Sequence, residues 1–345
     1  MWHLEKPTKT TLDKYTKKLL PNLKKNIENS GSLTPNVKDV LLPPMVAGGK
    51  DESHLKALLI SEPVDLFVLS ENLMSQIIPG YNFNELSEYS KAVKAKSRTP
   101  LQATLVRKYD ILEKLAMVFD YQGSLGGNKT RSYAITDAAN HNTCVYCNRQ
   151  YTFNIVREGG KNNKNRIARP DLDHWFPKSL FPLMSLSYYN LIPSCTVCNR
   201  SAKLDEIWTL DTHIHPYLTT SDAPTFKFRY NVGINGTWEI DFDNLNGKEE
   251  NTMKSLCLKE VYQKHCGLEV ADLIELATKN NGSYMKQLYG TILNLYTGGS
   301  EKAKAYRLLL GTEMLPVAYK NRPLSKLKKD IIEQIEKAQS MKFFE

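Results

Sequence analysis

Residues 171–179 read Asp-Leu-Asp-His-Trp-Phe-Pro-Lys-Ser, which places a carboxylate and an imidazole side by side at Asp173 and His174. Two cysteine pairs frame this stretch. The segment CVYC (144–147) precedes it, and NLIPSCTVCNRSAK (190–203) follows it. What the Asp173–His174 pair can do therefore depends on the unit that the cysteines enclose.

The two cysteine pairs predict a metal site. Within each pair two residues separate the cysteines, so both sulfurs can reach one ion at about 2.3 Å. Two such pairs complete a tetrahedral site that suits zinc and has no open position for a substrate. We therefore expect a structural Zn²⁺ bound by four thiolates. Its ligands would be Cys144, Cys147, Cys195 and Cys198, whereas Cys257 and Cys266 fit no such spacing and are expected to be core thiols.

Composition indicates an ordinary globular protein. The 345 residues are 41% hydrophobic and 24% charged, which predicts two or three folding units with a real core. The chain begins without an apolar leader, and no run of about 18 apolar residues occurs. We therefore expect a cytoplasmic protein without a membrane partner, in a reducing compartment that favours metal binding over disulfides.

Charge favours a polyanionic partner. The net charge is +9, which by itself fits either a merely basic protein or one that binds nucleic acid. Residues 144–205 contain nine basic and four acidic side chains, so more than half of the excess lies in less than a fifth of the chain. This concentration around the cysteine pairs favours nucleic acid as the partner.

Local patterns predict an α+β protein in three parts. Residues 1–140 form a mainly helical region, with Leu12, Tyr15 and Leu19 at helical spacing and one helix over 101–121. Residues 141–218 form the cysteine-clasped unit. Residues 219–345 begin with a β-hairpin around Asn235-Gly236 and continue as helices, predicted over 268–277, 284–296 and 324–335.

The clasped unit contains the groups that phosphodiester hydrolysis needs. We expect extended segments over 150–156 and 167–175, and a helix that begins near Cys198. His174 suits a general base, while the Asp173 carboxylate and the Asn199 amide oxygen suit a hard cation such as Mg²⁺. Neighbouring side chains on a strand point to opposite faces, so this pair needs a bend or a strand end to converge.

Three further residues complete the predicted site. Asn190 is expected to hold the His174 loop by hydrogen bonds. Arg200 and Lys203 lie about one helical turn apart and are expected to bind phosphate. His213 and His215, in the segment DTHIHPY (211–217), are expected to close a turn after the unit, although a ligand role stays open for either.

Together, DLDHWFPKS, YYNLIPSC and CNRSAK resemble the HNH endonuclease family, in its branch with Cys₄ zinc knuckles. The resemblance covers residues 144–205 and implies a central ββα-metal finger. It implies that His174 is the general base, that Asp173 and Asn199 bind the catalytic metal, and that Asn190 organises the loop. The final histidine of the family name is replaced here by Asn199, so an all-oxygen ligand set favours Mg²⁺ or Mn²⁺.

The flanking segments resemble, more loosely, the HNH proteins of Septu-type bacterial antiphage defence. The segments FDYQG (119–123), CVYCNRQY (144–151), IHPY (214–217) and RPLSKLKKDI (322–331) carry this likeness. It implies an effector nuclease that acts on DNA together with an ABC/SMC-like ATPase. The residues do not distinguish DNA from RNA. A non-catalytic zinc-ribbon module that binds nucleic acid, or a scaffold subunit of an ATPase complex, is the alternative function.

Overall fold

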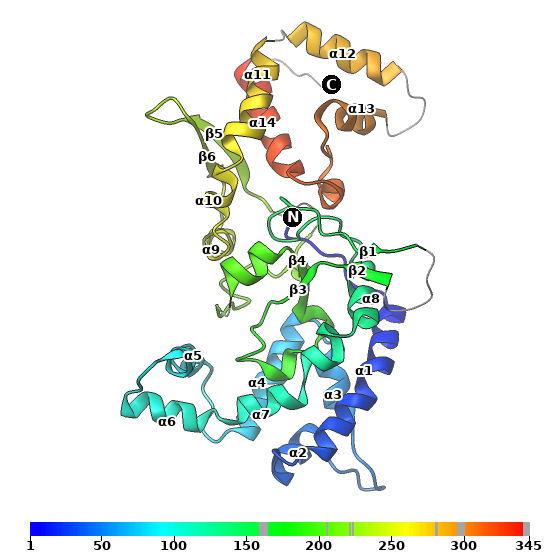
Figure 1. Cartoon of the computed structure of the whole chain (residues 1–345), viewed down its shortest axis with the longest axis vertical. Helices are drawn as coiled ribbons and strands as arrows, with labels where there is room; N and C mark the ends of the chain where they lie inside the picture. The colour runs from blue at the N-terminus through cyan, green and yellow to red at the C-terminus, as the bar shows by residue number, and fades with distance from the viewer. Residues whose placement is uncertain are drawn as a thin grey trace.

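The computed structural model describes residues 1–158, 165–204, 206–220, 222, 224–279, 282–294 and 301–340. Helices dominate this part of the chain, together with three small antiparallel strand pairs (Figure 1). The α+β prediction is confirmed at this level. The boundaries expected after residues 140 and 218 stay predictions. Within the described residues, no helix is both long enough and apolar enough to cross a bilayer.

The N-terminal region is helical, as predicted. α1 begins after Thr8, whose hydroxyl accepts a hydrogen bond from the Thr11 amide, and it buries Tyr15 and Leu19. The region comprises α1 (Lys9–Asn29), α2 (Pro35–Leu41), α3 (Ser53–Ile60), α4 (Pro63–Ile77), η1 (Phe83–Glu85), α5 (Leu86–Lys94), α6 (Pro100–Lys108), α7 (Ile111–Val118), η2 (Gln122–Gly126) and α8 (Lys129–Ala139), where η marks a short helix.

The single helix predicted over 101–121 is wrong, because the chain breaks at Tyr109 between α6 and α7. The Tyr109 ring is fully buried, and its hydroxyl lies 2.8 Å from the Glu85 carboxylate. α6 packs on α5, whereas α7 packs on η4 (Pro182–Met184) and α1. Apolar spacing continues across the break, so the pattern alone could not reveal it.

The central region contains two strand pairs. Its elements are β1 (Ile155–Val156), β2 (Arg166–Ala168), β3 (Asp171–His174), η4 (Pro182–Met184), η5 (Tyr188–Asn190), β4 (Leu191–Ser194), η6 (Val197–Lys203) and η7 (Pro216–Leu218). β3 pairs with β4, so that Asp171 lies opposite Ser194 and His174 lies opposite Leu191. The sequence predicted the extended run around β3 but not its partner strand β4. Residues 159–164, which include two of the basic residues counted over 144–205, lie outside the described residues.

The β-hairpin is confirmed. β5 (Lys227–Val232) pairs with β6 (Trp238–Asp243), with Phe228 opposite Phe242 and Tyr230 opposite Ile240. The following elements are α9 (Gly247–Ser255), α10 (Leu258–Gln263), η8 (Cys266–Val270), α11 (Ala271–Lys279), α12 (Gly282–Asn294), α13 (Glu301–Leu310), η9 (Pro316–Asn321) and α14 (Ser325–Ala338). Tyr296, the end of one predicted helix, is outside the described residues.

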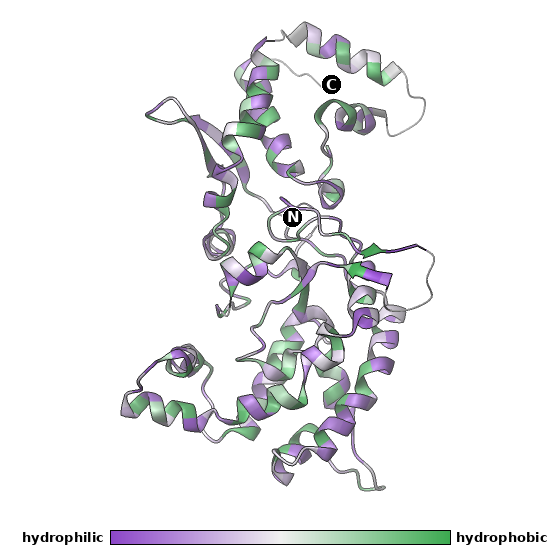
Figure 2. Cartoon of the chain, viewed as in Figure 1, coloured by the Kyte–Doolittle hydropathy of each residue, from purple (hydrophilic) through white to green (hydrophobic). Residues whose placement is uncertain are grey.

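Aromatic side chains fill the centre of the molecule. Trp175 and Trp208 are fully buried, with ring centroids 5.8 Å apart, and Tyr146 packs edge-on against Trp208. Figure 2 shows hydrophilic and hydrophobic residues alternating around most helices, which is the pattern of helices that cover a core on one face.

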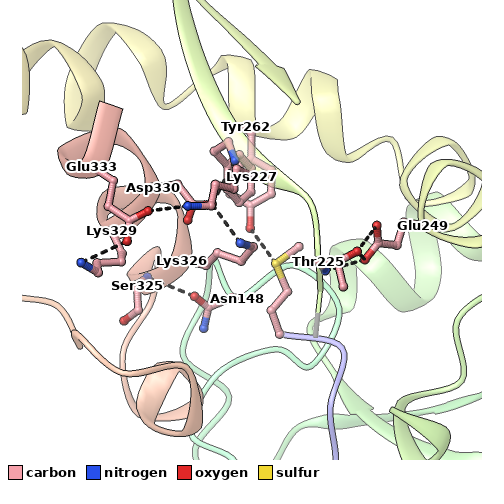
Figure 3. A network of polar contacts seen from close by, with 12 residues as sticks. Asn148, Thr225, Lys227, Glu249, Tyr262, Ser325, Lys326, Lys329, Asp330 and Glu333 are labelled. Atoms are coloured by element: carbon pink, nitrogen blue, oxygen red, sulfur yellow. Dashed lines mark hydrogen bonds and ion pairs between the residues drawn. The ribbon is translucent and has the colours of Figure 1, made fainter. Parts of the chain in front are cut away.

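Hydrogen bonds join the C-terminal region to the first cysteine pair (Figure 3). Asn148, which directly follows Cys147, accepts from the Ser325 amide at 3.1 Å through its side chain, and its backbone carbonyl accepts from the Leu324 amide at 2.6 Å. The Tyr262 hydroxyl donates to the Cys147 carbonyl. The cysteine turn is therefore built together with residues almost 180 positions away.

A buried ion pair within α14 is hydrogen-bonded to the hairpin. Asp330 accepts from the Lys326 ammonium and from the Phe228 amide, both at 2.9 Å. The side chains of Lys326 and Asp330 are only 8% and 6% exposed. By contrast, Arg229 and Asp243 form an exposed ion pair on the same hairpin.

We predict that Asp330→Ala lowers the free energy of unfolding by about 3–5 kcal/mol, because it leaves Lys326 as a buried charge without a partner. Asp243→Ala should cost only about 0–1 kcal/mol, because its ion pair is exposed. Urea unfolding of both variants beside the wild type measures the difference. Equal costs for the two variants would contradict the structural role of the buried pair.

Candidate functional site

The four paired cysteines lie together in the interior. All four are buried, and their sulfurs lie within 4.8 Å of one another. The Cys147 and Cys195 sulfurs are 3.9 Å apart. A tetrahedron with metal–sulfur distances of about 2.3 Å has sulfur–sulfur edges of about 3.8 Å. The cluster can therefore hold a metal ion such as zinc, as the sequence predicted.

A turn of the backbone directs the sulfurs of Cys144 and Cys147 toward the same point. Asn148 adopts a left-handed conformation with φ of 46°, which turns the chain directly after Cys147. The Asn148 amide donates to the Cys144 carbonyl at 2.9 Å, and the Cys144 amide donates to Gln150. In the second pair, Cys195 follows β4 and Cys198 lies in η6. The cluster thus fixes the end of β4 and the start of η6 against the first turn.

Strand β3 presents its side chains alternately to two faces. Asp171 and Asp173 contact residues of η6, whereas His174 contacts Tyr121 and Ser185 on the other side. Asp173 and His174 are therefore neighbours in sequence whose side chains have different surroundings. No bend brings them together.

The buried charge of Asp173 is paired with a buried cation, Lys203. Its carboxylate accepts from the Tyr146 hydroxyl at 2.6 Å and lies 3.3 Å from the Lys203 ammonium. The side chains of Lys203 and Asp173 are 0% and 3% exposed. Lys203 also donates to the His174 carbonyl at 2.6 Å and lies over the Trp208 ring. In this structure the Lys203 ammonium contacts Asp173 and the His174 carbonyl and does not face solvent. A phosphate in solvent therefore could not reach it.

Asp171, which the sequence analysis did not select, lies beside two of the predicted residues. Arg200 makes two hydrogen bonds to its carboxylate, at 3.0 and 3.1 Å. The Asn199 amide nitrogen lies 3.3 Å from the same carboxylate. The Asp171 side chain is 19% exposed and that of Arg200 is 68% exposed, so this group can be reached from solvent. The structure brings Asn199 to Asp171, not to Asp173.

His174 has one nitrogen fixed by the backbone. Its Nε2 lies 3.0 Å from the Ser185 carbonyl, which can only accept, so Nε2 carries the proton of the neutral ring. Nδ1 is then the basic atom, and within the described residues it has no hydrogen-bond partner. Burial, with Lys178 as a second cause, lowers the pKa of His174 to about 3. The imidazole is therefore neutral at pH 7.

Asn190 organises the loop after β3, as the sequence predicted. It is fully buried, and its side-chain oxygen accepts from the Phe176 amide at 2.7 Å. Its side-chain nitrogen donates to the carbonyls of Phe176 and Met184 at 3.1 and 3.0 Å. One side chain therefore satisfies three backbone groups that would otherwise be buried without partners.

Two residues beside His174 were not predicted as part of the site. The Tyr121 ring packs edge-on against His174, with centroids 4.4 Å apart. The Lys178 ammonium lies 5.0 Å from the centre of the Tyr121 ring. Tyr121 belongs to FDYQG and Lys178 to DLDHWFPKS, so both lay within segments already noted, but no spacing rule connects Tyr121 with His174 across 53 positions.

The remaining histidines and cysteines lie outside the metal cluster. His213 stacks on Trp208 and bonds to Ser255, and the His215 side chain accepts from the Tyr217 amide. Both therefore help to close the chain after the central unit. Cys266 is buried as predicted, whereas Cys257 is exposed, so its assignment as a core thiol is wrong.

A scan against protein-family models, a search of curated proteins and a search of solved structures each found no match to the chain. The resemblance to HNH endonucleases therefore rests on the motif residues themselves. The geometry of those residues is what a functional proposal can use.

We predict that Cys195→Ser lowers the bound zinc from about one ion per chain and destabilises the fold by more than about 3 kcal/mol, because losing a structural metal is among the most costly single changes. Cys257→Ser is the matched control, since Cys257 is exposed and lies outside the cluster. Metal content by mass spectrometry and urea unfolding measure both effects. Full zinc content and unchanged stability in Cys195→Ser would contradict the metal site.

Proposed function

We propose that the chain is a metal-dependent endonuclease of the HNH type, with β3, β4 and η6 as its ββα-metal finger. The observation that carries the proposal is His174: the Ser185 carbonyl fixes its tautomer and leaves Nδ1 as a base. Asn190 holds the loop that follows, and the cysteine cluster holds the helix that faces the strand. These supports keep a base in place, which general-base catalysis requires.

In this proposal His174 Nδ1 takes a proton from the water that attacks the phosphodiester. The neutral imidazole is free to accept that proton, but its pKa of about 3 makes it a weak base until the phosphate anion binds beside it and raises that pKa; the Nε2–H bond to Ser185 holds the ring orientation. Lys178 and Arg200 are exposed cations on the two sides of β3 and attract the phosphate backbone. The expected products carry a 5′-phosphate and a 3′-hydroxyl.

The residues that fit a hard cation are Asp171 and Asn199. Their side chains already lie together, and rotation of the Asn199 amide would present its oxygen. Asp173, the ligand expected from the resemblance, has both oxygens near Lys203 and one bonded to Tyr146. Asp171 lies on the face of β3 that meets η6 and His174 on the other face, so a Mg²⁺ or Mn²⁺ held by Asp171 and Asn199 would offset the charge of the phosphate attacked beside His174 only where the phosphodiester passes around the end of the strand. Arg200 would have to leave Asp171 for the cation to bind.

The substrate and the partner are proposed from charge and resemblance. The net charge of +9 supports a nucleic-acid substrate, for which we propose DNA. The resemblance of the flanks supports a role as effector of an antiphage defence complex with an ABC/SMC-like ATPase. The alternative function is a non-catalytic nucleic-acid-binding or scaffold subunit, which the internal neutralisation of Asp173 by Lys203 would suit.

We predict that purified protein cuts plasmid DNA with Mg²⁺ or Mn²⁺, and that His174→Ala lowers the rate by at least about 100-fold, because general-base catalysis contributes roughly that much or more. His54→Ala is a matched control, since the His54 ring also bonds a backbone carbonyl, at 3.0 Å, but lies on α3. Gel electrophoresis with each metal and with EDTA measures cutting. No cutting by the wild type, alone or with the partner ATPase, would favour the alternative function.

We further predict that Asp171→Asn and Asp173→Asn fail in different ways. Asp171→Asn should lose metal-dependent cutting with little change in stability, because Asp171 is partly exposed. Asp173→Asn should cost about 3–5 kcal/mol of stability, because Lys203 loses a buried partner. Urea unfolding and plasmid cutting are measured on both. A stable Asp173→Asn that no longer cuts, beside a fully active Asp171→Asn, would return the metal-ligand role to Asp173.

A further inference from the structure

A hollow of about 160 Å³ lies between α1 and α8, where η2 and η5 also reach its wall. Its walls are mainly apolar and come from Tyr15, Leu19, Leu125, Ile135 and Tyr188. The Tyr15 hydroxyl already donates to the Leu186 carbonyl at 2.6 Å. Tyr15 therefore contributes the carbon atoms of its ring, and no free hydroxyl, to the wall of the hollow. An apolar cavity of about 150 Å³ is large enough for one benzene ring.

Three cations also line this hollow, and no carboxylate does. They are Lys14 and Lys18 on α1 and Arg131 on α8. Arg131 donates to the Ser124 carbonyl at 3.1 Å through one nitrogen, which leaves other donors of its guanidinium. Across the ranges that the structure describes, neither lysine makes an ion pair. Like charges around an apolar wall repel one another, and a bound anion would remove that repulsion.

We propose that this hollow binds a small organic anion, an aryl phosphate or aryl carboxylate whose single ring enters the apolar part. The anionic group would lie among Lys14, Lys18 and Arg131. Most ligand sites have this composition, with apolar walls and a few charged groups that fix orientation. The volume limits the buried part to about one ring. The hollow therefore fits a small molecule rather than a strand of nucleic acid.

The hollow is separate from His174 but shares supporting elements with the proposed active site. Leu125 lies in η2, a short helix that begins directly after Tyr121, and the Tyr121 ring packs on His174. Tyr188 lies in η5, which ends at Asn190. The binding proposal does not rest on the nuclease proposal, and it can be tested with EDTA present and no nucleic acid.

The test is calorimetric titration of the full chain with phenyl phosphate. Wild type is expected to bind it more tightly than either inorganic phosphate, which lacks the ring, or phenol, which lacks the charge. Lys14→Gln/Lys18→Gln should weaken binding by about tenfold, since it removes two exposed cations that would pair with the anion. The control Lys17→Gln/Lys25→Gln removes the same charge from exposed positions of α1 outside the hollow and should change affinity less than twofold.

A second variant tests the apolar part. Ala138 lines the hollow and is exposed, so Ala138→Phe should fill the space and abolish phenyl phosphate binding without lowering stability. Three results would each overturn the proposal: no binding by the wild type, equal affinity for inorganic phosphate and phenyl phosphate, or equal affinities in the two double-lysine variants. Circular dichroism of every variant verifies that the fold is retained.

Discussion

The cysteine cluster is the constraint on which the central part of the molecule depends. It joins residues 144–147 to residues 195–198, so the chain between them forms a closed loop. β3 and β4 are only four residues long and form a sheet of two strands, which is marginal by itself. A metal at the cluster would fix η6 against this pair. The positions of Asn199, Arg200 and Lys203 relative to β3 follow from that attachment.

Features set by local spacing could be predicted from the sequence. The Cys-x-x-Cys pairs identified the cluster, and alternating aromatics around Asn235-Gly236 identified the hairpin with its strands. Asn190 was assigned to hold the loop, and its three hydrogen bonds do so. In these cases the residues that interact are either close in sequence or marked by a chemical pattern.

Features set by long-range packing could not be predicted. Which of two carboxylates faces Asn199 depends on how η6 lies over β3, and no local pattern records that position. Lys203 is buried against the Trp208 ring and the Asp173 carboxylate, and that carboxylate also accepts from the Tyr146 hydroxyl, so these partners come from distant parts of the chain. Likewise, Tyr109 at the break between α6 and α7 is bonded to Glu85, a contact that the apolar spacing does not record. A periodic apolar pattern indicates which face of a helix is buried, but not which element packs against that face.

The hydrogen bonds between the C-terminal region and Asn148 affect the order in which the protein folds during synthesis. Synthesis on the ribosome proceeds from the N-terminus, and regions complete in sequence can fold first. The C-terminal hydrogen-bond partners of Asn148, from Tyr319 to Ser325, emerge more than 170 residues after it. The attachment of the first cysteine turn to the C-terminal region must therefore wait until those residues have left the ribosome, although the turn itself can close earlier through the Asn148–Cys144 hydrogen bond. During translation this attachment is a late, long-range step rather than an early local one.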